Sequence, residues 1–150
     1  MTVRTWAFLI LLATAFQPFQ LLAADPDKPE QKFVAILVWG TDGDKPDDKE
    51  LKEVDSALRE KFQKIFKWKN YYEVSRTNVA VKVGESKHIK LSKKCEVKIH
   101  QTEKEGMDVE LFGEGKSVYK GKTSMPLKDI LTLAGHEKNE NAWFVVLKPE

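Results

Sequence analysis

Two short segments, one near each end of the chain, carry apolar side chains at every position. Phe33–Trp39 reads FVAILVW and Ala142–Leu147 reads AWFVVL. Runs of this length, rich in β-branched and aromatic residues, are typical of strands with both faces covered. The alternative for Phe33–Trp39 is a strand that is covered on one face only, with a tightly packed edge elsewhere. We therefore expect these segments to pair or neighbour each other in the middle of a sheet.

One strong helical pattern follows the turn at residues 40–46. Its apolar side chains recur at steps of three or four, which places them on one face; they are Leu51, Val54, Leu58, Phe62 and Ile65. Asp47, with Glu50 three residues later, has the spacing of a capping box. The pattern predicts a helix over Asp48–Phe66. No second helix of comparable quality is evident, so its apolar stripe should lie against a sheet.

From Tyr71 onward apolar and polar residues alternate, as in strands with one solvated face joined in antiparallel hairpins. In Cys95–His100, for example, Cys95, Val97 and Ile99 alternate with Glu96, Lys98 and His100. The expected fold is α+β, with one amphipathic helix packed on a mainly antiparallel sheet of six to eight strands. The alternative is a small β-barrel or sandwich capped by one helix.

The first 24 residues have the layout of a secretory signal peptide. Arg4 precedes an unbroken apolar run, Trp6–Phe16, and small residues follow at Ala23 and Ala24. This run is shorter than the roughly 18 apolar residues expected of a membrane span. We expect a signal peptide over 1–24 cleaved near Ala24, a polar lead-in over 25–31 and a single domain over 32–150. The protein should be secreted or periplasmic, with no stable membrane insertion after cleavage; an uncleaved anchor is the alternative.

Charge is balanced overall but unevenly placed. Lys and Arg total 25 against 23 acidic residues, which argues against a nucleic-acid partner. Lys61–Lys104, however, holds 12 basic residues against 4 acidic ones. The simple interpretation is lysines on solvated strand faces. The sharper one is a basic surface that meets an anionic partner, such as a lipid headgroup or an acidic polymer. For the protein as a whole, the expected partner is a protein or an envelope polymer.

Cys95 is the only cysteine, so the fold contains no intramolecular disulfide. We expect Cys95 to be a buried small apolar residue. A disulfide-linked dimer is the alternative.

A search for reaction chemistry is mostly negative. His88, His100 and His136 lack metal-ligand spacing, and no GxSxG, HExxH, P-loop or GxGxxG motif is present. The acid-rich stretch 41–50 does not follow the order of an EF-hand loop. We therefore predict no catalytic residues, no metal and no cofactor. The sequence favours a non-enzymatic protein over an enzyme with a site assembled from dispersed residues.

Trp68, Tyr71 and Tyr72 form a local aromatic cluster after the predicted helix. They are the candidate surface binding residues, because aromatic rings stack on sugars and peptides. The interpretation we favour is structural: aromatic side chains that fill the corner where the helix returns to the sheet.

Two resemblances bear on function. A lone helix before antiparallel strands is similar to the layout of cystatins, whose QxVxG hairpin implies protease inhibition; in Ala80–Gly84 only the glycine matches that motif, which disfavours this assignment. The stretches Leu58–Tyr71 and Leu133–Leu147 resemble small exported bacterial proteins of unknown function. That resemblance implies an apolar-strand, helix and β-rich architecture, and no activity.

The sequence therefore predicts an exported, non-enzymatic binding or structural module of the cell envelope. A protease-inhibitor-like domain and an enzyme with a dispersed site are the alternatives. An exposed sheet face or edge should form the binding surface. A deep pocket with converging histidine and carboxylate groups would favour an enzyme instead.

Overall fold

The computed structural model describes residues 28–45, 50–102, 106–135 and 141–150. In chain order the elements are β1 (Glu30–Thr41), β2 (Lys52–Glu53), α1 (Ser56–Ile65), β3 (Asn70–Lys82), β4 (Ser86–Lys90), β5 (Cys95–Gln101), β6 (Gly106–Gly113), β7 (Lys116–Ser124), β8 (Leu131–Ala134) and β9 (Ala142–Pro149). The predicted signal peptide lies outside the described residues. Within the described part of the chain, no helix is long and apolar enough to cross a membrane.

The strands form two antiparallel sheets. One has five strands in the order β2-β3-β1-β9-β8, and the other has four in the order β4-β5-β6-β7. The two wholly apolar segments are indeed neighbours, because β1 pairs with β9 from Phe33 opposite Pro149 to Gly40 opposite Ala142. β1 begins at Glu30, inside the segment expected to be a lead-in.

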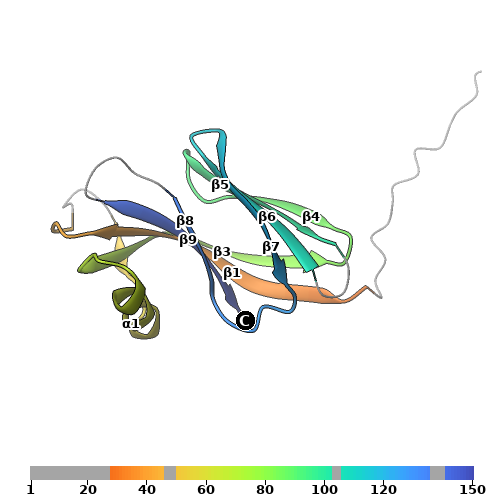
Figure 1. Ribbon diagram of the computed structural model, residues 1–150, viewed down its shortest axis with the longest axis horizontal. Coiled ribbons are helices and arrows are strands. Elements are labelled where there is room, and N and C mark those ends of the chain that lie inside the picture. Colours follow the sequence, from red (N-terminus) through yellow and green to blue (C-terminus); the bar gives the residue numbers. More distant parts are fainter. Residues whose placement is uncertain (1–27, 46–49, 103–105, 136–140) are drawn as a thin grey trace, which may run out of the picture.

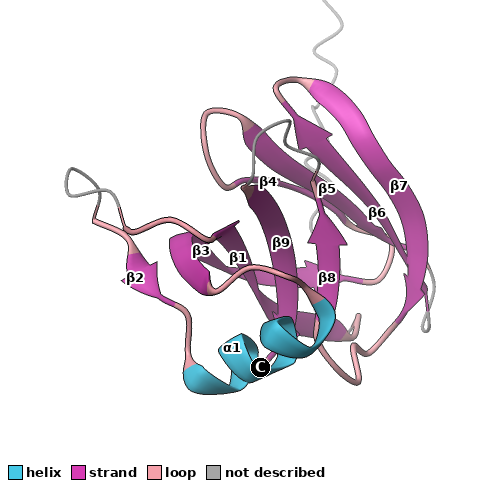
Figure 2. Cartoon of the chain, turned by 60° about the vertical axis from the view of Figure 1, so that its left-hand side comes forward, coloured by secondary structure: helices cyan, strands magenta, loops and turns pink. Residues whose placement is uncertain are grey.

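Both faces of β1 and β9 are covered, by different layers. Phe33, Ala35 and Leu37 of β1 belong to a core shared with the four-stranded sheet. Ile36 and Val38 belong to a second core shared with α1. Figures 1 and 2 show the resulting order, with α1 and the four-stranded sheet on opposite sides of the five-stranded sheet. This arrangement explains why these two strands need no polar face.

The α+β class and the antiparallel pairing are confirmed. The expected single sheet of six to eight strands is replaced by two sheets with nine strands among the described residues. The reason is that one helix of ten residues can cover only one side of the central strands. A second sheet supplies the apolar cover that the other side requires.

The helix begins later than predicted. Lys52 and Glu53 pair with Glu73 and Tyr72 of β3, so their backbone groups are committed to a sheet. Asp55 then caps α1, its carboxylate accepting a hydrogen bond from the Leu58 N–H at 2.9 Å. The predicted capping residue Asp47 lies outside the described residues. The helix prediction over Asp48–Phe66 is therefore wrong for residues 50–55 and for the final residue.

The predicted apolar stripe is buried at its centre but not at its end. Val54, Leu58 and Phe62 are buried, whereas the Ile65 side chain is 71% exposed. The helix ends at Ile65, and Phe66 continues in an extended conformation. The Phe66 ring packs on Phe144 of β9 with 4.4 Å between ring centroids, so Phe66 fills the site predicted for Ile65.

Candidate binding surface

The four-stranded sheet has one apolar and one polar face. Its inner side chains are buried in the core between the sheets; they include Ile89, Cys95, Val97, Ile99, Val109 and Leu111. Alternation along each strand places the intervening polar residues on the outer face. The polar residues of the alternating pattern therefore form an outer face that no other described layer covers.

Strand register arranges these polar residues in two rows across the sheet. The first row is Ser86, His100, Asp108 and Lys122, and the second is His88, Lys98, Glu110 and Lys120. Residues directly opposite on neighbouring antiparallel strands have Cβ atoms about 4.5–5.5 Å apart, so each row is a line of potential contacts.

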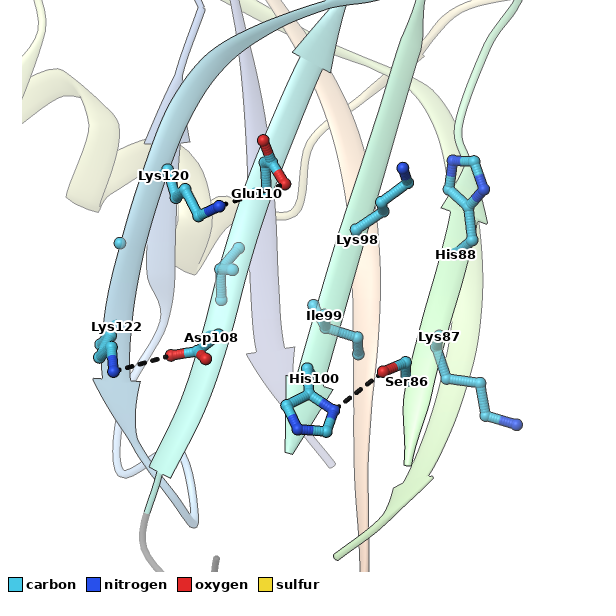
Figure 3. A pocket seen from close by; sticks show the side chains of 12 residues that line it. Ser86, Lys87, His88, Lys98, Ile99, His100, Asp108, Glu110, Lys120 and Lys122 are labelled. Atoms are coloured by element: carbon cyan, nitrogen blue, oxygen red, sulfur yellow. Dashed lines mark hydrogen bonds and ion pairs between the residues drawn. The ribbon is translucent and has the colours of Figure 1, made fainter. Parts of the chain in front are cut away.

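The two rows line a groove with a volume of about 650 Å³. Figure 3 shows the side chains that border it, from β4 across to β7. On the β7 side, Lys122 Nζ lies 3.6 Å from Asp108 Oδ1 and Lys120 Nζ lies 4.0 Å from Glu110 Oε2. These are loose, solvent-exposed pairs, and such pairs stabilise a fold by at most about 1 kcal/mol.

Lysine side chains at the groove are more exposed to solvent than the carboxylates with which they pair. The side chains of Lys120 and Lys122 are 77% and 84% exposed, whereas those of Glu110 and Asp108 are only 27% and 40% exposed. The two rows together hold three lysines, Lys98, Lys120 and Lys122, and two carboxylates, Asp108 and Glu110. The outermost charge on this face is therefore positive, although carboxylates lie beneath it.

Aromatic and histidine side chains flank the centre of the groove. Lys98 Nζ lies 4.7 Å from the ring centroid of Phe112, a cation–π distance. His88 Nε2 lies 2.6 Å from Glu96 Oε2 on the neighbouring strand. The Lys98 ammonium thus lies over an aromatic ring, and Figure 3 shows its side chain extending from β5 away from the row that holds His100.

Ser86, His100 and Asp108 share a row and have the composition of a hydrolytic triad. Ser86 Oγ lies 2.8 Å from His100 Nδ1. Asp108, however, directs its carboxylate toward Lys122 rather than His100 (Figure 3). A working triad needs an acid that orients the imidazole and donors that hold an oxyanion. Because Asp108 pairs with Lys122, it does not orient the His100 imidazole, and the row does not form a Ser-His-Asp triad.

The three aromatic residues singled out from sequence lie elsewhere, at the junction of α1 and β3. Tyr71 and Tyr72 are buried, with 1% and 7% exposure, and Trp68 is half-buried. The rings of Tyr71 and Phe62 are 5.1 Å apart, and Trp68 meets Phe144 edge to face at 5.5 Å. Trp68 and Tyr71 pack the corner between helix and sheet. Tyr72 is the next residue on β3 and instead lies beside Trp39, with 5.9 Å between ring centroids.

Cys95 lies on the inner face of β5 with 4% exposure. Burial raises the pKa of its thiol to about 12, with a smaller contribution from the charge of Glu96. A thiol in this state carries almost no thiolate at neutral pH and is a packing residue.

The described residues contain no group of three or more side chains suited to hold a metal ion. The groove residues were visible in the sequence only as the polar half of the alternating strands. The sequence did not show that His88, Lys98, Glu110 and Lys120 would form one row, because the row depends on register across four strands.

Comparisons with protein families, with curated proteins and with solved structures find no match for this chain. The stretch Ala80–Gly84, compared above with the cystatin hairpin, covers the end of β3 and the turn before β4.

Proposed function

We propose that the protein is an exported, non-enzymatic binding module of the cell envelope, and that the groove on the four-stranded sheet binds an anionic macromolecule. The observation that carries this proposal is the exposure difference within the groove. The ammonium groups of Lys120 and Lys122 project beyond the carboxylates with which they pair.

Recognition would work by exchange of weak ion pairs. An arriving anionic chain replaces the loose contacts of Lys120 and Lys122 with its own carboxylate, sulfate or phosphate groups. The exchange costs little because pairs at 3.6 and 4.0 Å in water are weak. Lys98 supplies a third positive charge at the groove. The affinity should fall as salt rises, since exposed charges are screened within about 10 Å at 0.1 M salt.

The test is direct binding to polyanions. Polygalacturonate, dextran sulfate and poly-glutamate should bind the purified protein at low salt, and neutral dextran should not. The triple variant Lys98→Gln, Lys120→Gln and Lys122→Gln should bind at least about tenfold more weakly, because it removes the exposed positive charge of the groove.

A matched control separates the groove from overall charge. Lys28, Lys69 and Lys128 are exposed and lie outside the four-stranded sheet. Changing these three to Gln removes the same net charge and should leave the affinity nearly unchanged. Equal losses in both triple variants, or no binding of any polyanion, would overturn the proposal.

A further inference from the structure

β7 forms one edge of the four-stranded sheet. Among the described strands its hydrogen-bonded neighbour is β6, and its other side has no paired strand. Figure 2 shows β7 as the outermost strand of this sheet. A free edge presents a row of backbone N–H and C=O groups that can pair with another chain. This edge borders the groove, because Lys120 and Lys122 belong to β7.

The usable part of this edge is the second half of β7. The register with β6 shifts between Leu111 and Phe112, which interrupts regular pairing near Ser117. From Tyr119 to Ser124 the pairing with β6 is regular. These residues form a regularly paired template about six residues long, the usual length of a strand in a globular protein.

The two faces of this template differ in chemistry. Lys120 and Lys122 lie opposite Glu110 and Asp108 and therefore face the groove. Tyr119 lies opposite Leu111, on the inner side, yet it is 41% exposed because β7 is at the edge. A strand added here would meet positive charge on one face and an aromatic side chain on the other.

We propose that the anionic partner is an extended acidic polypeptide segment, which adds to β7 as a fifth strand of the sheet. This inference rests on the proposed function and names the partner class. Strand addition uses the free backbone groups of the edge for affinity and the alternate side chains for specificity. A polysaccharide would use only the lysines.

Like charge disfavours pairing of β7 with the same strand of a second copy. β7 contains three lysines and no acidic residue. Pairing of two β7 strands would bring lysines opposite lysines, which is destabilising. The same lysines that disfavour self-pairing attract an acidic strand.

The geometry specifies the pattern of the partner. Acidic residues at alternate positions would lie opposite Lys120 and Lys122. Apolar residues between them would pack beside the ring of Tyr119, which covers Gly121. A segment that alternates acidic and β-branched residues satisfies both faces.

The test compares two peptides of equal length and charge, a Glu-Val repeat and a Glu-Pro repeat. Proline lacks the N–H group and favours the polyproline II conformation, so the second peptide cannot join a sheet. The Glu-Val repeat should bind at least about tenfold more tightly. It should also slow backbone hydrogen exchange in residues 119–124, which contacts by lysine side chains alone would not do.

A charge-swap variant supplies the second measurement. Lys120→Glu with Lys122→Glu should weaken the Glu-Val repeat and strengthen a Lys-Val repeat, an inversion that loss of folding cannot produce. The double change Lys69→Glu with Lys128→Glu should invert nothing.

The outcomes distinguish the two proposals. Equal binding of both peptides, or binding of dextran sulfate but of neither peptide, overturns strand addition and leaves the groove proposal standing. Failure of every polyanion overturns both. Dimers formed through β7 in the absence of peptide would show that a second copy is the occupant.

Discussion

The carboxylate of Asp55 joins the start of α1 to β9, the final strand of the chain, through Lys148. One oxygen accepts a hydrogen bond from the Leu58 N–H at 2.9 Å, and the other lies 3.5 Å from Lys148 Nζ in β9. The first contact satisfies a backbone donor that the helix leaves unpaired at its N-terminus. The second is an exposed ion pair, which places the start of the helix beside β9 and adds little to stability.

Replacing Asp55 with alanine should therefore destabilise the protein by about 1 kcal/mol, within the range of roughly 0.5–2 measured for lost N-caps. Asp55→Asn should retain most of this stability, because its amide oxygen can still accept from Leu58. Urea unfolding measures both changes. Glu60→Ala, on an exposed position of the same helix, should change the unfolding free energy by less than about 0.5 kcal/mol. Equal effects at positions 55 and 60 would contradict the capping role.

Acid should remove part of the Asp55 contribution. The backbone hydrogen bond from Leu58, more than the charge of Lys148, holds the pKa of Asp55 below its ordinary value of 3.8. A lowered pKa means that the folded state favours the carboxylate, so this contribution is present above pH 3.8 and is lost as pH falls through the lowered value. The stability difference between wild type and Asp55→Asn should thus change between about pH 7 and about pH 2, moving in favour of the variant at low pH. A constant difference would show that Asp55 has the same pKa in the folded and unfolded chains.

The sequence predicted the central strands because their information is local. Phe33–Trp39 and Ala142–Leu147 have no polar face, and only the middle of a covered sheet accepts such segments. The start of the helix, in contrast, is not determined by local sequence. Leu51 and Val54 fit a helical period, but pairing of Lys52 and Glu53 with β3 draws this segment into the sheet.

The division into two sheets and the position of the groove also depend on long-range packing. Alternation in β5 and β6 showed that Lys98 and Glu110 would share a polar face, but not that they would lie opposite each other. The exposure difference between Lys120 and Glu110 arises because one is on an edge strand and the other on an interior strand. Strand order across the sheet sets this difference, and composition does not reveal it.

Leu58 should be among the residues most sensitive to truncation. Its side chain is 1% exposed and lies in the core beneath α1 with Phe62 and Phe144. Leu58→Ala should cost about 2–5 kcal/mol, the range for removal of a large buried side chain. Gln63→Ala, on the exposed face of the helix, should cost less than about 0.5 kcal/mol. Similar costs at 58 and 63 would show that the helix presents a different face to the sheet.

Cys95 should be inert in the folded protein. Burial raises the pKa of its thiol to about 12, and the thiolate is the reactive form. A coloured disulfide reagent at neutral pH should react slowly with the native protein and stoichiometrically after denaturation. The protein should also form no dimer that is lost on reduction. Rapid reaction of the folded protein would place Cys95 on the outer face and would require the opposite register for β5.

The buried amide of Gln101 should limit stability. Gln101 is fully buried, and within the described residues neither its Nε2 nor its Oε1 has a hydrogen-bond partner. It is the last residue of β5, on the same face as Cys95, Val97 and Ile99, and it lies opposite Met107 of β6. A buried polar group without a partner costs about 1–3 kcal/mol.

Gln101→Met replaces the amide with an apolar group of similar length and should raise the free energy of unfolding by about 1 kcal/mol. The backbone of Gln101 still donates to Glu85 and accepts from Gly84, so the strand itself is unaffected. Gln63→Met makes the same chemical change at an exposed position and should be nearly neutral. A loss of stability in Gln101→Met, measured by urea unfolding, would show that the amide is hydrogen-bonded in solution, and that its role is to fix the end of β5 rather than to fill the core.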